Sequence, residues 1–208
     1  MQPVVLKDPI EVVDALAELG LSWDVLREAM LGGEGERDEC TANDPPGAPG
    51  FFSYARTTRR LGELLIPSGW TRQDKENLAL VVSPSRDIAI AVSTGDEGTG
   101  VHYLPARSKY PKGPATVTAV EQNRQLLLFH NESQKTTPPA AWRTWLLLRR
   151  RVGNKLYCEL SLPYSVGEDD RVEEWTRRII FDPISFEPSI NDGDDTGDPI
   201  VINVPRRP

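Results

Sequence analysis

The chain of 208 residues contains only two His and two Cys, so few of its side chains suit nucleophilic chemistry. His102 follows closely after Asp96 and Glu97. If Cys40 lay beside this acid–histidine cluster, its thiol would be a nucleophile and His102 would be the base that activates it. Nothing in the spacing brings Cys40 close to the cluster, so an enzyme with a polar site near Asp96, Glu97 and His102 is only our third functional hypothesis. The sequence favours a protein that is not an enzyme.

Metal chemistry has little support in the sequence. A zinc site with the usual nitrogen and sulfur ligands would need both His and both Cys, and no local pair such as Cys-x-x-Cys is present. Asp192, Asp194, Thr196 and Gly197 fit the first positions of a calcium loop, but its twelfth position is Asn203 instead of a bidentate Glu. We therefore expect neither a metal ion nor another cofactor, and interpret the acidic run as a solvated turn.

Charge is the most specific feature of the sequence. The net charge is −7, but residues 1–50 carry −8, residues 51–100 zero, residues 101–164 +7 and residues 165–208 −6. The total therefore excludes a strongly basic nucleic-acid binder without excluding a local basic patch. Three explanations are open: the acidic flanks fold back on the basic middle, long solvated loops hold the acids, or the segments form a dipolar surface that steers a charged partner.

The basic middle segment is one candidate binding surface. Trp142 and Trp145 are interleaved with its arginines, as in platforms that stack the bases of single-stranded nucleic acids. Because alternate residues of a strand face opposite sides, we expect these two rings on opposite faces of a sheet, which weakens such a platform. The candidate residues for binding a partner or a nucleic acid are Arg143, Arg149, Arg150, Arg151 and Lys155, with Arg56, Arg59 and Arg60 on a helix.

Carboxylates gathered on a small protein can imitate the phosphates of a nucleic acid and occupy the basic groove of another protein. The candidate acidic surface comprises Glu34, Glu36, Asp38, Glu39, Asp192, Asp194, Asp195 and Asp198. Our leading hypothesis is a non-enzymatic interaction protein that binds a macromolecular partner, a protein in the first place, through its segregated acidic and basic surfaces. An inhibitor that mimics nucleic acid is one form of it, and the alternative is a nucleic-acid-binding accessory protein that uses the basic middle segment.

Helix signals are clearest near the start of the chain. Asp8 and Ser22 are N-cap residues for two short helices within residues 9–32, and Gly20 ends the first. A helix-turn-helix has the same outline, but the second helix offers only Arg27 as a base, so we expect plain packing. Residues 33–50 read as a flexible, acidic loop rich in Pro and Gly. Further helices are expected over residues 51–66 and from Thr118 to residue 129.

Strand signals dominate the rest of the chain. Residues 78–82 and 88–92 predict one hairpin, and residues 142–149 and 156–162 another. Residues 95–100 read as a turn into a strand at 101–104, and residues 105–114 as a basic loop. Residues 175–181 and 200–204 predict two more strands.

The order of these elements indicates an α+β fold, a mainly antiparallel sheet built from hairpins and packed with about four helices. We expect a single domain over residues 1–208, with its core at 51–182 and an acidic C-terminal segment, 183–208, that holds the last strand. The apolar runs are too short to span a membrane, we expect no signal peptide, and Cys40 and Cys158 suit free thiols. These features predict a soluble, cytoplasmic protein that does not bind membranes.

Overall fold

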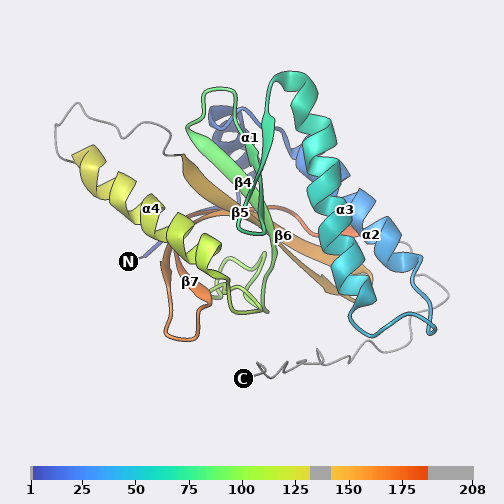
Figure 1. Cartoon of the computed structure of the whole chain (residues 1–208). Coiled ribbons are helices and arrows are strands. Elements are labelled where there is room, and N and C mark those ends of the chain that lie inside the picture. Colours follow the sequence, from blue (N-terminus) through green and yellow to red (C-terminus); the bar gives the residue numbers. More distant parts are fainter. Residues whose placement is uncertain (1, 132–141, 187–208) are drawn as a thin grey trace.

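A computed structural model describes residues 2–131 and 142–186 of the chain, which form an α+β fold around one mixed, mostly antiparallel sheet (Figure 1). The strand order is β1-β7-β6-β5-β4-β3-β2, with β8 paired to β6. The β1–β7 and β4–β5 pairs are parallel and the others are antiparallel. The strands are β1 (Val4–Leu6), β2 (Thr71–Lys75), β3 (Leu78–Val82), β4 (Ile88–Thr94), β5 (Arg143–Val152), β6 (Lys155–Val166), β7 (Val172–Ile180) and β8 (Ile184–Ser185).

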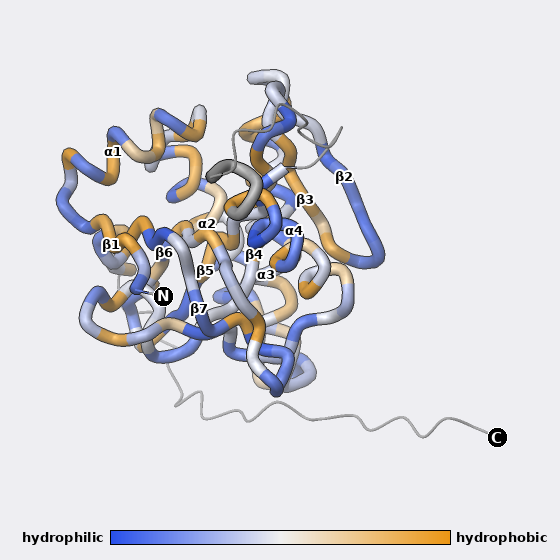
Figure 2. The backbone as a smooth tube through the Cα atoms, turned by 90° about the vertical axis from the view of Figure 1, so that its left-hand side faces the viewer, coloured by the Kyte–Doolittle hydropathy of each residue, from blue (hydrophilic) through white to orange (hydrophobic). Residues whose placement is uncertain are grey.

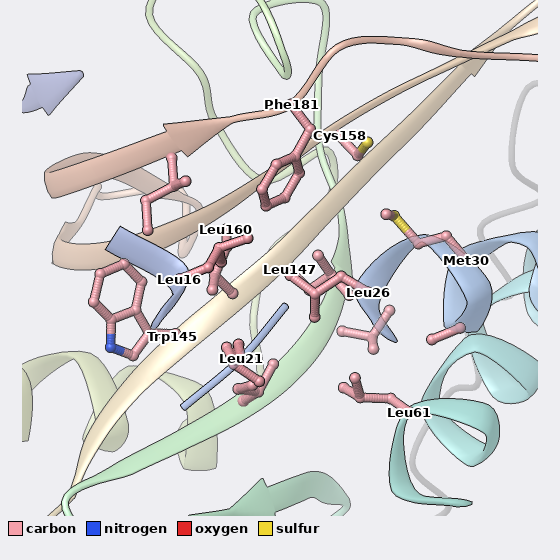
Figure 3. Close-up of a cluster of buried hydrophobic side chains, with 14 of the residues drawn as sticks. Leu16, Leu21, Leu26, Met30, Leu61, Trp145, Leu147, Cys158, Leu160 and Phe181 are labelled. Carbon is pink, nitrogen blue, oxygen red and sulfur yellow. The ribbon is translucent and has the colours of Figure 1, made fainter. Parts of the chain in front are cut away.

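Helices cover both faces of the sheet. The helices are α1 (Pro9–Glu18), α2 (Trp23–Asp38), α3 (Ala48–Leu65) and α4 (Pro114–Asn131), and the short 3₁₀ helix η1 (Ile66–Ser68) follows α3. A large apolar cluster lies between one face and helices α1 to α3, with Leu26, Leu61, Trp145 and Leu147 among its buried members (Figure 3). A smaller cluster lies on the other face and includes Val120 of α4.

Local signals explain where the first two helices begin. The side chain of Asp8 accepts a hydrogen bond from the backbone N–H of Ile10, and that of Ser22 accepts one from Val25. Both contacts satisfy an N–H group that the first helical turn leaves open. The expected N-terminal helical pair is therefore present.

The second helix is longer than the sequence indicates. It continues past Gly32 to Asp38, and α3 begins at Ala48, so only nine residues of the expected loop at 33–50 separate the two helices. The extra turn packs closely on α3: a Cβ atom placed on Gly33 would lie 2.0 Å from Thr57 Oγ1. This tertiary contact overrides the helix-ending tendency of the two glycines.

The two main hairpins are confirmed, while the expected strand at 101–104 is wrong, because those residues form turns. Two short edge strands, β1 and β2, were not predicted, since edge strands need little apolar alternation. Figure 2 shows β2 as largely hydrophilic, and most of its residues are exposed. Residues 200–204 lie outside the described part of the chain.

Candidate functional site

A gap between neighbouring strands opens a cavity in the described structure. The β2–β3 pairing continues to Lys75↔Leu78, and the β4–β5 pairing continues to Thr94↔Arg149. The β3–β4 pairing, in contrast, consists only of Val81↔Ile90 and Val82↔Ala89. The first half of β3 therefore separates from the last half of β4, and a cavity of about 600 Å³ lies between them.

Both helical layers contribute to the wall of this cavity. Gly47, Gly50 and Phe51 come from the start of α3, and Thr116 comes from the first turn of α4. Helix N-termini carry partial positive charge, because their first N–H groups have no partner within the helix. The cavity volume lies within the range of about 300–1,000 Å³ that is typical of ligand-binding pockets.

The cavity wall is basic although the chain as a whole is acidic. Among the described residues its lining includes six cationic side chains and no Asp or Glu: Arg37, Lys109, Lys112, Arg149, Arg150 and Arg151. We call this space the basic cavity. Its electrostatic potential favours an anion.

Lys112 is the most unusual of these cations. Its Nζ donates a hydrogen bond of 2.7 Å to Ser93 Oγ on β4, and no carboxylate among the described residues forms an ion pair with it. Burial lowers the pKa of Lys112 to about 8, since desolvation penalises the ammonium form. A bound anion would compensate that penalty.

Arg149 and Arg151, in contrast, already have internal counter-ions from α2. Glu34 is fully buried, and its two carboxylate oxygens lie 3.2 Å from Arg149 Nη1 and 3.3 Å from Arg151 Nη1. Arg151 also pairs with Asp38. Burial lowers the pKa of Arg149, although Glu34 opposes this effect. For Arg151, burial is the largest single influence and lowers the pKa, but the hydrogen bonds that it donates to Asp38 and Glu34 and the charges of both carboxylates together outweigh burial and raise the pKa.

This network corrects one expectation from the sequence: Glu34 does not lie on an acidic surface, because it neutralises two arginines inside the fold. The remaining wall cations have different partners. Arg150 donates to the Glu97 carbonyl oxygen and lies over the Tyr157 ring, and Lys109 lies over the Tyr110 ring. Within residues 2–131 and 142–186, Lys109, Lys112 and Arg150 are thus wall cations without a carboxylate partner.

The predicted basic helix does not join this group. Arg56 pairs with Glu36, Arg59 with Glu63, and Arg60 with both Glu63 and Glu28. These pairs are substantially exposed and lie along α2 and α3.

The other predicted basic residues divide between the two ends of β5. Arg143 is exposed at the start of the strand, and Lys155 is exposed after the turn that follows it. As expected, the rings of Trp142 and Trp145 belong to the apolar clusters on opposite faces of the sheet.

The predicted acids are only partly described. Asp38 and Glu39 are exposed at the end of α2, and Glu36 is half-buried in its ion pair with Arg56. Asp192, Asp194, Asp195 and Asp198, with the calcium-like run around them, lie outside the described residues.

The four residues of the enzymatic hypothesis do not come together as a catalytic group. Asp96 Oδ1 accepts from the backbone N–H groups of Gly98 and Arg107, and therefore stabilises the turn. Glu97 is exposed, and the ring of the exposed His102 lies 3.3 Å from Lys7 Nζ. Cys40 Sγ contacts the Glu36 carbonyl oxygen instead of any of these three side chains.

A second buried charge lies outside the basic cavity. Arg178 and Glu159 form an ion pair through a 2.6 Å contact between Nη2 and Oε2, and both side chains are buried. The remaining donors of Arg178 reach the carbonyl oxygens of Gly98, Val101 and Leu104. This cluster fastens the turns at 95–104 to the sheet.

Sequence reasoning missed Lys109, Lys112 and Ser93. The only available signal was the basic composition of the loop at 105–114, because nothing local places Lys112 beside β4. Within the described residues no group of three or more His, Cys, Asp or Glu could hold a metal ion. No helix in the same residues is long and apolar enough to cross a membrane.

Comparison with protein-family models, with curated proteins and with solved structures finds no match to this chain.

Proposed function

We propose that this protein is a non-enzymatic interaction protein that binds an acidic segment of a partner protein in the basic cavity. The observation that carries the proposal is a wall with six cationic side chains and no carboxylate in its described lining, within a chain of net charge −7. Cations held near a low-dielectric wall attract an anion more strongly than exposed ones do. The proposed partner is a charged macromolecule, as in our leading hypothesis from the sequence, and its acidic segment contacts the protein in this one cavity.

The alternatives have weaker support. A nucleic-acid-binding surface would use Arg56, Arg59 and Arg60, but these side chains are engaged by Glu28, Glu36 and Glu63. A mimic of nucleic acid would need free carboxylates, and Glu34 and Asp38 are bound to arginines.

Fluorescence anisotropy with short labelled probes tests the proposal. We expect a Glu-rich peptide to bind at about 50 mM salt and to dissociate as salt rises, since exposed charge interactions are screened. The same peptide with Gln in place of Glu should not bind. Lys112→Met should weaken binding of the Glu-rich peptide, while Arg72→Gln, on the exposed edge strand β2, should not.

The outcomes separate the three classes of function. Failure of the Glu-rich peptide to bind at low salt overturns the proposal. Tighter binding of a single-stranded oligonucleotide, lost in Arg143→Gln, would favour the nucleic-acid-binding alternative.

A further inference from the structure

The edge of β4 inside the basic cavity has the properties of a strand-docking site. The Ile88 carbonyl oxygen accepts from Ser83 N–H on the β3 side, so Ile88, Ile90 and Val92 direct their backbone groups toward β3. Ile90 pairs with Val81, but the ladder has no pair at Val92. The cavity therefore lies where the next ladder pair would form.

The open part of the edge has definite limits. Lys109 N–H donates to the Thr94 carbonyl oxygen at 3.0 Å, which closes the far end of the edge. The accessible stretch therefore runs along residues 91–94. At about 3.3 Å per residue, it can accept a segment of four or five residues in extended conformation.

The two faces of the sheet differ in charge at this point. On the α3 face, Arg149 and Arg151 are neutralised by Glu34 and Asp38. On the α4 face, Lys112 contacts Ser93, and strand alternation places Arg150 on the same face as Leu146 and Leu148. The uncompensated positive charge of these strands is therefore on the α4 face.

The α3 face of the cavity offers apolar contacts instead. Phe51, Tyr54 and Pro49 line the cavity from the start of α3, and Phe51 is 63% exposed. An exposed aromatic ring beside a cavity is typical of a binding surface. Because side chains of a strand alternate between faces, a docked strand would meet cations with one set of residues and aromatic rings with the other.

We infer that the basic cavity takes an extended segment of a partner protein in which acidic residues alternate with apolar ones, and that this segment adds to the edge of β4 at Val92. This inference rests on the proposed function and specifies how the acidic partner is recognised. Backbone hydrogen bonds to Val92 would supply affinity, and the alternating side chains would supply specificity. Carboxylates at every second position would contact Lys112 and Arg150.

The test uses the full chain and four labelled peptides of equal length. The first alternates Glu with Val, and the second contains the same residues with all Glu in one block. The third is the first with N-methyl groups on alternate backbone nitrogens of its central residues, and the fourth is a matched control with the methyl groups shifted by one residue. N-methylation at the hydrogen-bonding positions removes backbone donors but keeps every side chain.

We expect the alternating peptide to bind most tightly, and N-methylation in one of the two registers to weaken it about fivefold or more. Binding of the alternating peptide should also slow hydrogen exchange at the Val92 amide. Lys112→Met and Arg150→Gln should each weaken this peptide by about tenfold, while Arg72→Gln should leave its affinity unchanged.

Two results would overturn the inference without affecting the proposed function. One is equal affinity of the alternating, blocked and N-methylated peptides, because charge alone would then explain binding. The other is binding of the alternating peptide with unchanged exchange at Val92. If no Glu-containing peptide binds, the proposed function fails and the inference fails with it.

Discussion

The Arg178–Glu159 cluster and the Lys112 side of the basic cavity both remove positive charge from water, but of these two only the cluster has a carboxylate partner in the described structure. In the cluster, Glu159 receives hydrogen bonds from Arg178, Gly100 and Ser161, so every oxygen of the carboxylate has a partner. In the cavity, the Lys112 ammonium group has only the Ser93 hydroxyl as a hydrogen-bond partner among residues 2–131 and 142–186. Buried charge that is compensated internally fastens the fold, whereas a partly buried charge without a counter-ion is suited to an external anion.

Removing the counter-ion in the cluster should have the largest effect. Glu159→Gln leaves the Arg178 charge buried and unpaired, which typically costs about 3–5 kcal/mol. We expect the urea midpoint to fall accordingly, with an unchanged slope. A loss below about 1 kcal/mol would mean that the cluster does not fasten the fold.

In the cavity, removing the charge itself should stabilise the protein. The pKa of Lys112 is about 8 in the folded chain, against an ordinary value of 10.5. Below pH 8 both states are protonated, and the folded state bears the full desolvation penalty, up to about 3 kcal/mol. We therefore expect Lys112→Met to raise the free energy of unfolding at pH 7.

The pH dependence checks the sign of this effect. Between pH 8 and about 10.5 the unfolded chain keeps a proton that folded Lys112 has lost, so the wild-type stability should rise with pH relative to Lys112→Met. Urea unfolding of both proteins at several pH values measures the difference. A gap that is constant across this range would show that Lys112 is not desolvated.

On one side of the cavity Glu34 of α2 neutralises Arg149 and Arg151, and the stability of this side should depend on close contact between α2 and α3. Gly33→Ala places a methyl group 2.0 Å from Thr57 Oγ1, beside Glu34, and should cost about 1–3 kcal/mol. Gly35→Ala is the matched control, because a Cβ atom there meets nothing within 4 Å. Thermal unfolding should show a loss for the first variant and a gain of about 0.5–1 kcal/mol for the second.

The smallest effect is expected for an exposed ion pair. Arg177, next to Arg178 on β7, pairs with Glu18, whose side chain is 65% exposed. Glu18→Gln should change stability by less than about 1 kcal/mol, since exposed pairs are screened by water and salt. The contrast with Glu159→Gln isolates burial as the cause, and equal losses in the two variants would contradict it.

Much of the fold was predictable because its signals are local. Asp8 and Ser22 as N-cap residues, the turn at Gly153 and the alternation along the central strands depend on neighbouring residues alone. The segment charges also suggested that acidic α2 could meet the basic middle segment, and Glu34 does contact Arg149 and Arg151. The sequence could not show whether a given charge pairs inside the fold or faces a partner protein. The ion-pair partners Glu34 and Arg149, and Glu34 and Arg151, are more than a hundred positions apart.

The candidate site was largely hidden from sequence reasoning. Arg149, Arg150 and Arg151 were predicted as binding residues by composition, but only strand alternation within the folded sheet separates Arg150 from the two arginines that Glu34 neutralises. The gap beside Val92 depends on how far β3 follows β4, and no residue type marks that point.

Periodicity, capping and composition act over short distances, so the class of fold, the starts of the first two helices, the main hairpins and the uneven charge could be predicted from the sequence, whereas α3 and α4 begin earlier than expected, at Ala48 and Pro114. Which cations are neutralised and which are left facing a cavity depends on the folded arrangement. Ion pairing depends on distances between residues far apart in the chain, and the desolvation of Lys112 depends on everything packed around it.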